Sequence, residues 1–254
     1  MKEKIEKTRW QDAQKFEYND WANMPNIVTN EWEELVKKYS KLFPKISKRV
    51  GLKTSDLILD VGCGPTVPAR LLGAGKVTGL EPLADKLKIS GRKYLPGVNI
   101  VCGKAEKMPF KDHAFHFVVC RNVIDHTQDP KVIIREVKRV LKNNGCFLLI
   151  SYTYSPFITF VKNASERLGL FRNVGHPFTF TPEMLDQLAM PEFEIKERYT
   201  IYTGKDSTDY GKVGEVIIDN SLLHKVLIFI NNNILGSTWF LKEYGFLCSP
   251  TSLL

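Results

Sequence analysis

Features of secreted, disulfide-bonded and membrane-spanning proteins are missing from this sequence. Its 254 residues include five cysteines, an odd number, and no CxxC pair, which argues against a disulfide framework and favours a reducing compartment. The first 20 residues are charged and lack the apolar core of a signal peptide, so we expect a cytoplasmic protein. The apolar stretch at 222–230 has nine residues, whereas a membrane-spanning helix needs about 20. We interpret this stretch as a core or cap helix, with peripheral contact at a membrane surface as the alternative.

Repeats and low-complexity tracts are also missing, and 43% of the residues are apolar. A chain of this length and composition can bury a core without disulfides or a structural metal. The net charge of +8 permits an anionic partner. Apolar residues at helical spacing interrupt the basic segments, however, so we do not expect a nucleic-acid partner. We also expect no metal, because His116 begins and Cys120 ends one expected strand, which leaves them and His113 too far apart to share an ion.

Short apolar runs alternate with helical patterns through the middle of the chain, which is typical of βαβ units. The expected strands are residues 57–61, 77–80, 98–102, 115–120 and 146–151. The helices expected between them start near Pro68, over residues 84–94, and at Asp129-Pro130, the last ending at Asn144-Gly145. Five strands within about 95 residues predict a Rossmann-like, doubly wound, mostly parallel α/β sheet with helices on both faces.

The flanking segments predict more helices and two closing strands. From Asn30 onward the apolar residues follow a helical pattern, and Asn30 with Glu33 has the spacing of a capping box. A further helix is expected from Thr181. Strands at 193–202 and 244–248 complete a seven-stranded sheet, and alternate residues of 193–201 should share one face.

These patterns predict a single domain over residues 1–254. We divide it into a helical cover (1–50), a ligand-binding core (51–151) and a substrate-side region with the closing strands (152–254). Segments 152–180 and 205–241 form a small cap in this interpretation. Segment 152–180 is either a mobile cover over a ligand crevice or an irregular loop.

The most informative segment is Asp60-Val61-Gly62-Cys63-Gly64-Pro65, which joins a buried strand to a helix. Its glycines let backbone N–H groups approach a ligand. Glu81 lies 21 residues beyond Asp60, at the end of the next strand, where a carboxylate can accept hydrogen bonds from both hydroxyls of a ribose. The dinucleotide fingerprint needs a glycine where Val67 stands. The pattern therefore predicts a nucleoside ligand without a pyrophosphate.

Six ordered segments make the chain resemble the class I S-adenosylmethionine-dependent methyltransferases of the methyltransferase-11 group. Residues 57–64 (LILDVGCG) resemble the first motif of that family, Gly79-Leu80-Glu81 its acidic second motif, and residues 103–110 its adenine-site loop. Residues 115–119, 122–126 and 135–145 resemble the segments that come after this loop in the family. The resemblance implies a Rossmann-like fold, S-adenosyl-L-methionine as cofactor and S-adenosyl-L-homocysteine as product.

The resemblance also implies which residues bind the cofactor. Those at its methionine part are Asp60, Gly62, Cys63, Gly64 and Asn122. Those at its ribose and adenine are Glu81, which holds the ribose, and Pro82, Leu83, Ala105 and Glu106. Three positions depart from the family pattern, namely Thr66, Lys104 and His116. Lys104 stands where an Asp or Asn often meets the adenine amino group, and an ammonium cannot accept a hydrogen bond.

A base is needed if the methyl acceptor carries a proton of high pKa. His126 is our candidate, because it follows the fourth strand at the edge of the crevice and histidine titrates near neutral pH. Asp125 is its expected orienting partner, and His176 is the second candidate base. The alternative is that His126 packs on the floor of the crevice or contacts the cofactor.

A finer resemblance concerns the acceptor. The chain resembles methyltransferases that accompany surface-glycan and glycolipid assembly at Trp10, Gln11, Ala13, Gln14, Glu17 and Trp21, at Asn122, Asp125 and His126, and at His176-Pro177-Phe178. Both tryptophans are candidates to cover the cofactor, and packing onto the sheet is the alternative. We predict transfer to oxygen on a small molecule or on a sugar or lipid precursor. The alternatives are a carbon methyltransferase acting on a polyprenyl or quinone-like lipid, an RNA methyltransferase, and a non-catalytic nucleoside-binding module.

Overall fold

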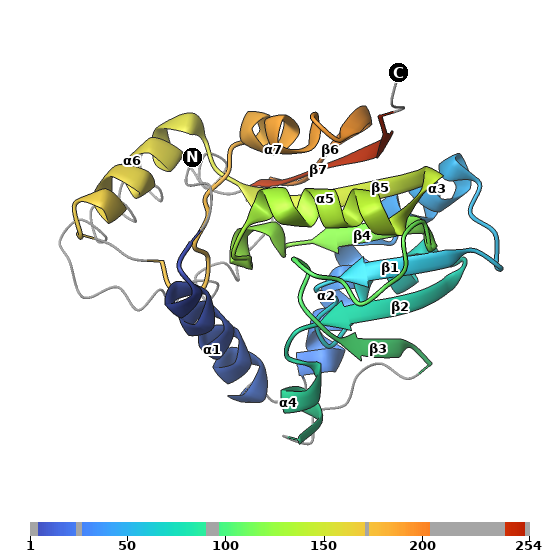
Figure 1. Ribbon diagram of the computed structural model, residues 1–254, viewed down its shortest axis with the longest axis horizontal. Helices are drawn as coiled ribbons and strands as arrows, with labels where there is room; N and C mark the ends of the chain where they lie inside the picture. Colours follow the sequence, from blue (N-terminus) through green and yellow to red (C-terminus); the bar gives the residue numbers. More distant parts are fainter. Residues whose placement is uncertain (1–4, 24–26, 90–96, 171–172, 204–241, 252–254) are drawn as a thin grey trace.

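The computed structural model describes residues 5–23, 27–89, 97–170, 173–203 and 242–251. Within these ranges one sheet has the strand order β3-β2-β1-β4-β5-β7-β6 (Figure 1). The neighbours among β1 to β5 pair in parallel, and β7 pairs antiparallel with both β5 and β6. The bounds are β1 Leu57–Val61, β2 Lys76–Glu81, β3 Asn99–Cys102, β4 Phe115–Arg121, β5 Leu141–Thr153, β6 Phe193–Thr203 and β7 Lys242–Pro250. The predicted Rossmann-like, mostly parallel sheet is confirmed.

Helices cover both faces of the sheet. They are α1 Lys7–Asn23, α2 Ile27–Tyr39, α3 Leu42–Val50, α4 Ala84–Ile89, α5 Pro130–Val140, α6 Pro156–Arg167 and α7 Pro182–Ala189, with short 3-10 helices η1 Pro68–Leu72 and η2 Ile124–His126. Buried side chains of α5 and α7 pack with Leu59 and Val118 on one face, and those of α2, α3 and η1 pack with Ile58 and Phe117 on the other. Figure 1 shows α5 in front of the sheet and α2 and α3 behind it. Neighbouring strand residues therefore serve opposite cores, as buried parallel strands require.

Two helix starts predicted from the sequence are confirmed by their caps. The Asp129 side chain accepts hydrogen bonds from the Lys131 and Val132 N–H groups at 2.9 and 3.3 Å. The Thr181 hydroxyl accepts one from the Met184 N–H at 3.3 Å. Both caps satisfy N–H groups that the first helical turn leaves unpaired. The capping box predicted at Asn30 is wrong, because α2 already begins at Ile27.

The predicted end of α5 at Asn144-Gly145 is also wrong. β5 follows α5 directly with Leu141, which pairs with Phe115, and regular pairing resumes at Cys146. The residues between them form a bulge in the strand. Gly145 fits there because a Cβ at this position would stand 2.9 Å from the His116 carbonyl oxygen.

A second bulge overturns the prediction that alternate residues of 193–201 share one face. The ladder between β6 and β7 shifts its register between Ile195 and Glu197. Phe193 and Ile195 pack on the α5 side of the sheet, whereas Tyr199 packs on the α2 and α3 side. The extra residue in the bulge rotates the strand by one position, which exchanges its two faces.

Three expected segments differ from the structure in extent. Segment 152–180 contains α6, a helix of 12 residues that the sequence analysis left as a cover or a loop. The helix expected over 84–94 is described only as α4, since residues 90–96 lie outside the described ranges. The same holds for 205–241, which includes the apolar stretch at 222–230.

Candidate functional site

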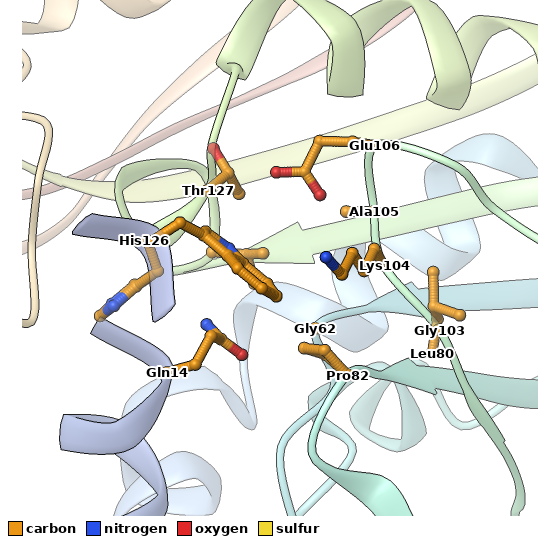
Figure 2. A pocket seen from close by; sticks show the side chains of 12 residues that line it. Gln14, Gly62, Leu80, Pro82, Gly103, Lys104, Ala105, Glu106, His126 and Thr127 are labelled. Atoms are coloured by element: carbon orange, nitrogen blue, oxygen red, sulfur yellow. The ribbon is translucent and has the colours of Figure 1, made fainter. Parts of the chain in front are cut away.

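A small cavity lies beyond the carboxyl ends of β1 and β2 and beside the segment after β4. β1 pairs with β2 on one side and with β4 on the other, which makes this the switch point where open α/β sheets bind ligands. The lining residues, most of them labelled in Figure 2, are Trp10, Gln14, Gly62, Leu80, Pro82, Gly103, Lys104, Ala105, Glu106, Val123, His126 and Thr127.

The glycine turn after β1 brings the backbone to this cavity. Gly62 has a φ of +60°, in the left-handed region, and a Cβ there would overlap the Val123 side chain. Gly64 has a φ of +54°, and the Trp21 ring lies 3.6 Å from the place that its Cβ would take. At Gly62 the backbone needs a positive φ and has no room for a Cβ beside Val123. Only glycine meets both requirements, so Gly62 is a close-approach position as well as a turn residue.

Glu81 ends β2 behind this turn and is 2% exposed. Its Oε2 accepts a hydrogen bond from the Gly64 N–H at 3.1 Å, and its Oε1 accepts one from the Leu83 N–H at 2.9 Å. These bonds fix the carboxyl group and use one lone pair on each oxygen, which leaves two lone pairs to accept from ligand hydroxyls. Burial raises the pKa of Glu81 to about 7, because the two backbone bonds offset only part of the cost of burying the charge.

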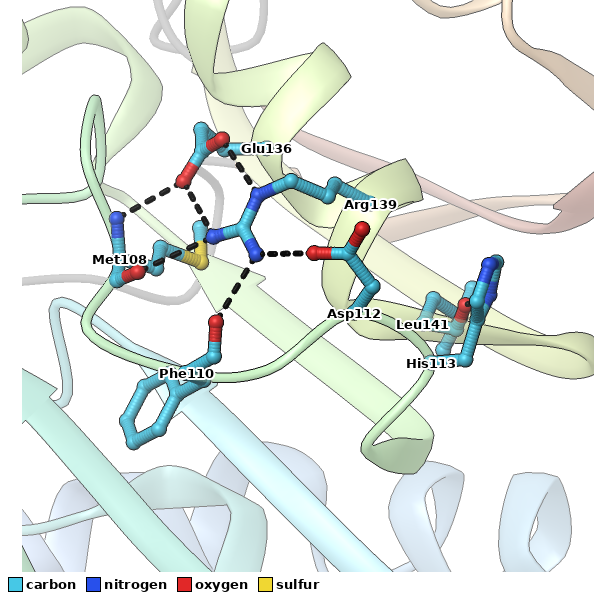
Figure 3. Close-up of polar contacts among 7 residues, drawn as sticks. All are labelled: Met108, Phe110, Asp112, His113, Glu136, Arg139 and Leu141. Atoms are coloured by element: carbon cyan, nitrogen blue, oxygen red, sulfur yellow. Dashed lines mark hydrogen bonds and ion pairs between the residues drawn. The ribbon is translucent and has the colours of Figure 1, made fainter.

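The loop between β3 and β4, which supplies four consecutive cavity residues, is tied to α5 by Arg139 (Figure 3). Arg139 donates to the carbonyl oxygens of Met108 and Phe110 at 3.0 and 2.8 Å, and to Asp112 at 2.7 Å. Glu136 receives two further bonds from the same guanidinium, both of 2.8 Å, and accepts one from the Met108 N–H at 2.8 Å. This network holds the loop that forms the cavity wall in place, although Arg139 and Glu136 do not line the cavity themselves.

α1 contributes the remaining wall through residues that lie on one helical face. Trp10 and Gln14 line the cavity, and Lys104 places its Nζ 3.8 Å from the centre of the Trp10 ring. Glu17 and Trp21 continue the same face, since the four positions are spaced i, i+4, i+7 and i+11. Trp10 lines the cavity, whereas Trp21 lies beside Gly64 and does not line it. The sequence analysis named Gln14 and Glu17 in a resemblance but gave them no role in the site.

The predicted cofactor residues divide into three groups. Gly62, Pro82, Ala105 and Glu106 line the cavity. Cys63, Gly64, Glu81 and Leu83 belong to the turn and strand end directly behind it. Asp60 and Asn122 do not line it. Leu80, Gly103 and Val123 lie within the predicted motifs and Thr127 follows one; all four line the cavity, although the sequence analysis gave them no cofactor role.

Asp60 and Asn122 are committed to other parts of the protein. Asp60 accepts a hydrogen bond from the Ala69 N–H at 2.7 Å and so holds the start of η1, and burial raises its pKa to about 7. Asn122 donates to Glu243 at 3.0 Å, in a network with Arg121 and Tyr39 that links β4 and β7 to α2. Both positions support the site through the backbone that they hold.

The three predicted catalytic residues come together at the edge of the cavity. Asp125 and His126 lie in η2, and His176 reaches them from the segment before α7, where the Phe178 N–H donates to the Asp125 carbonyl at 3.2 Å. The Asp125 carboxylate lies 2.7 Å from His176 Nδ1 but 3.8 Å from His126 Nε2. The predicted pairing of Asp125 with His126 is thus corrected, because the side chain of Asp125 orients His176 instead.

His126 has a different environment from His176. Its Nδ1 lies 3.2 Å from the Glu17 carboxylate, and its ring centre lies 4.2 Å from that of His176. Burial lowers the pKa of His126, but the carboxylates of Asp125 and Glu17 raise it more, so the pKa lies above its ordinary value. The two histidines in turn outweigh burial and lower the pKa of Asp125 to about 2. His126 is therefore suited to carry a charge at the cavity rather than to take up a proton.

The same three side chains offer ligand atoms that lie within 4.8 Å of one another. A His-His-carboxylate set of this size can hold a transition-metal ion. In the present arrangement the Asp125 to His176 distance of 2.7 Å is that of a hydrogen bond. The described geometry therefore fits a proton-transfer pair directly.

Comparisons with known proteins find a methyltransferase domain in this chain. Residues 59–149 match the family model of the methyltransferase domain. The demethylmenaquinone methyltransferase of Chlorobaculum tepidum is 28% identical over 177 residues, which cover 65% of this chain and 70% of the relative. The solved YcgJ protein of Bacillus subtilis has a TM-score of 0.58 and 17% identity, with 84% of this chain and 98% of that chain covered.

The family match and the relatives decide the activity. The chain is an S-adenosylmethionine-dependent methyltransferase, with the methyltransferase domain over residues 59–149. Its fold is the Rossmann-like fold of the class I methyltransferases. The solved [4+2]-cyclase SpnF also shares the fold, with a TM-score of 0.52, 20% identity, and 83% of this chain and 80% of that chain covered. The fold alone thus does not fix the chemistry.

In this methyltransferase the residues around the cavity have the chemistry to hold the cofactor. The close-approach glycine, the buried carboxylate with two spare lone pairs and the aromatic wall from α1 are all present. No helix in the described ranges is long and apolar enough to cross a membrane.

Proposed function

We propose that this methyltransferase transfers a methyl group to a hydroxyl oxygen of a small molecule or of a sugar or lipid precursor. The observation that carries the proposal is the hydrogen bond of 2.7 Å between Asp125 and His176, next to the cavity that His126 lines. An acceptor hydroxyl must lose its proton as the new bond forms. A histidine oriented by a buried carboxylate is the usual protein group for this task.

The cofactor residues have a binding and positioning role. S-adenosylmethionine, when bound, supplies a methyl group on a sulfonium that a nucleophile can displace in line. Glu81 accepts from the ribose hydroxyls, and the backbone at Gly62 approaches the ligand. Trp10 and Gln14 of α1 exclude water from the cavity. Most of the catalysis then comes from holding the acceptor against the methyl group.

The proton path runs through His176. If His176 Nδ1 donates to Asp125, the lone pair on Nε2 is free to accept the proton of the acceptor hydroxyl. The oxygen–carbon bond forms, the bond from carbon to sulfur breaks, and the proton ends on Nε2. Asp125 stabilises the imidazolium that results. The ring of His126 lies beside that of His176, with 4.2 Å between the ring centres.

Transfer to carbon on a quinol-like lipid is the second candidate. It is supported by the similarity to the demethylmenaquinone methyltransferase of Chlorobaculum tepidum. A hydroquinone carries acidic hydroxyl protons, and the same histidine can accept one of them while the ring carbon takes the methyl group. The site chemistry serves both acceptors, so the product distinguishes them.

The test combines a binding assay with turnover. The purified protein is titrated with S-adenosylhomocysteine and then incubated with methyl-labelled S-adenosylmethionine and nucleotide-linked sugars, polyprenyl-linked sugars or menaquinol-type hydroquinones. We expect a methyl ether in the product, identified by mass spectrometry and NMR. A methyl group on a ring carbon would select the second candidate. Failure to bind S-adenosylhomocysteine would refute both.

The role of His176 is tested with the same assays. His176→Gln and Asp125→Asn should lower kcat by about 10²–10⁴-fold and leave the affinity for S-adenosylhomocysteine nearly unchanged, because neither residue lines the cavity. His113→Gln is the control, since His113 bonds to the carbonyl of Leu141, the first residue of β5, and does not line the cavity. Equal kcat in His176→Gln and in the wild type would remove His176 from the proton path.

A further inference from the structure

Most of the large apolar side chains of α6 and of the turn after it point to solvent. Phe157 and Phe160 of α6 and Leu168, which follows the helix, are 60, 70 and 72% exposed, and they fall on one side at i, i+3 and i+11. The opposite side holds the buried Ile158, Thr159 and Ser165, which are 3, 3 and 8% exposed. A helix of a monomeric soluble protein normally has the reverse orientation.

These side chains form a patch rather than scattered exposure. Six large apolar side chains are exposed in the described ranges, and four of them belong to α6 and the turn after it, the fourth being Leu170. The two others, Leu57 and Met190, lie on separate elements. Single exposed apolar residues need no explanation, whereas a contiguous group marks an interaction surface. We call these four residues of α6 and its turn the α6 patch.

The orientation of α6 is fixed by polar contacts on its other side and at its start. Ser155 caps the helix by accepting from the Ile158 N–H at 3.3 Å. Glu166 pairs with Arg9 of α1. Rotating the patch inward would break this ion pair and expose the buried hydroxyl side chains, so the patch stays outside.

Charge around the patch favours an anionic surface. The one acidic residue of α6 is Glu166, which is engaged with Arg9, whereas Arg167 is exposed next to the patch. The whole chain carries a net charge of +8. Apolar side chains bordered by cationic groups are the pattern of helices that lie in the interface of anionic membranes.

We propose that the α6 patch docks on an anionic lipid membrane, with its phenylalanines and leucines at the boundary between headgroups and acyl chains. α6 starts directly after β5, and the chain that follows it carries His176 to the cavity edge. Docking therefore places the acceptor side of the enzyme at the lipid surface. The conclusion about the acceptor rests on the proposed function. It narrows the acceptors to molecules that a lipid chain anchors in a membrane.

The test measures vesicle binding without turnover. The full-length protein is floated with vesicles of equal parts phosphatidylglycerol and phosphatidylcholine, and with vesicles of phosphatidylcholine alone. We expect binding to the anionic vesicles that weakens in high salt, and little binding to the neutral ones. Phe160→Ser and Leu168→Ser should each weaken binding by about tenfold. Met190→Ser is the matched control, with a side chain 50% exposed at the end of α7, and should bind as the wild type does.

Several results would overturn the proposal. They are absence of binding to anionic vesicles, equal binding to both vesicle types, and patch variants that bind like the control. A wild-type dimer in light scattering that Phe160→Ser converts to a monomer would assign the patch to a second copy of the chain. A thermal midpoint lowered far more by Phe160→Ser than by Met190→Ser would mean that the chain itself covers the patch. Unchanged affinity for S-adenosylhomocysteine shows that a variant is folded, so loss of vesicle binding is separate from failure of the proposed methyl transfer.

Discussion

Cofactor affinity should rise with pH through neutrality because of Glu81. The carboxyl group has a pKa of about 7 in the ligand-free protein, caused first by burial. Ribose hydroxyls donate to the ionised form, which has all its remaining lone pairs available. Ligand binding therefore favours deprotonation. With a pKa of about 7, the group is about nine-tenths protonated at pH 6 and about one-tenth protonated at pH 8, so affinity should improve by about tenfold, or about 1.4 kcal/mol.

Calorimetric titration with S-adenosylhomocysteine at pH 6, 7 and 8 measures this effect. Repeating the titration at pH 7 in buffers of different ionisation enthalpy gives the number of protons released, which should be about one half. Glu81→Gln should bind more weakly at pH 8 by about 1–3 kcal/mol, since it loses charge-assisted bonds. Its affinity should not change with pH, and it should release no proton.

Asp60→Asn is the matched control. Asp60 is also buried with a pKa of about 7, but it bonds to the Ala69 N–H and does not line the cavity. The variant should therefore keep the pH dependence of the wild type. The reasoning fails if wild-type affinity is flat across this range, or if Glu81→Gln keeps the slope.

Three further predictions concern the turn, the loop and the catalytic cluster. Gly62→Ala should lower the free energy of unfolding by about 1–2 kcal/mol for its left-handed backbone and further for the overlap with the Val123 side chain. Urea unfolding measures this loss, and an unchanged free energy of unfolding would contradict the close packing of Gly62 on Val123. Arg139→Leu removes the bonds from α5 to the β3–β4 loop, and urea unfolding should show a loss of about 2–3 kcal/mol; a loss below about 0.5 kcal/mol would mean that the loop is held by other contacts. Prolonged treatment with EDTA should leave kcat unchanged, because Asp125 and His176 already form a proton-transfer pair; a loss of activity that Mg²⁺ or Mn²⁺ restores would make this cluster a metal site.

The sequence predicted those parts of the fold that depend on neighbouring residues. Asp129 and Thr181 begin helices because their side chains bond to N–H groups two or three residues ahead, and such contacts are visible in the sequence. The bulge in β6 is different, because its position depends on pairing with β7, some 50 residues away. α6 escaped the apolar pattern for another reason. Its apolar side faces out, so the usual link between pattern and core does not apply.

The candidate site shows the same division. Gly62 and Glu81 follow from the strand, turn and spacing of one βαβ unit, and both lie where the motif places them. The partner of Asp125 depends on the path of a distant segment, which brings His176 closer than the neighbouring His126. Adjacency in sequence suggested the wrong pair because consecutive side chains in a short helix point in different directions.

α1 touches both halves of the active site, and this has a kinetic consequence. Trp10 and Gln14 stand in the cofactor cavity, while Arg9 reaches the Pro177 carbonyl at 3.4 Å, next to His176. One helix thus contacts both the cavity and the segment that carries His176. If the methyl donor binds in this cavity, its contacts with α1 bias the position of that segment before the acceptor arrives. Steady-state kinetics should accordingly show a compulsory order, with the nucleoside product leaving last and inhibiting competitively against the donor alone.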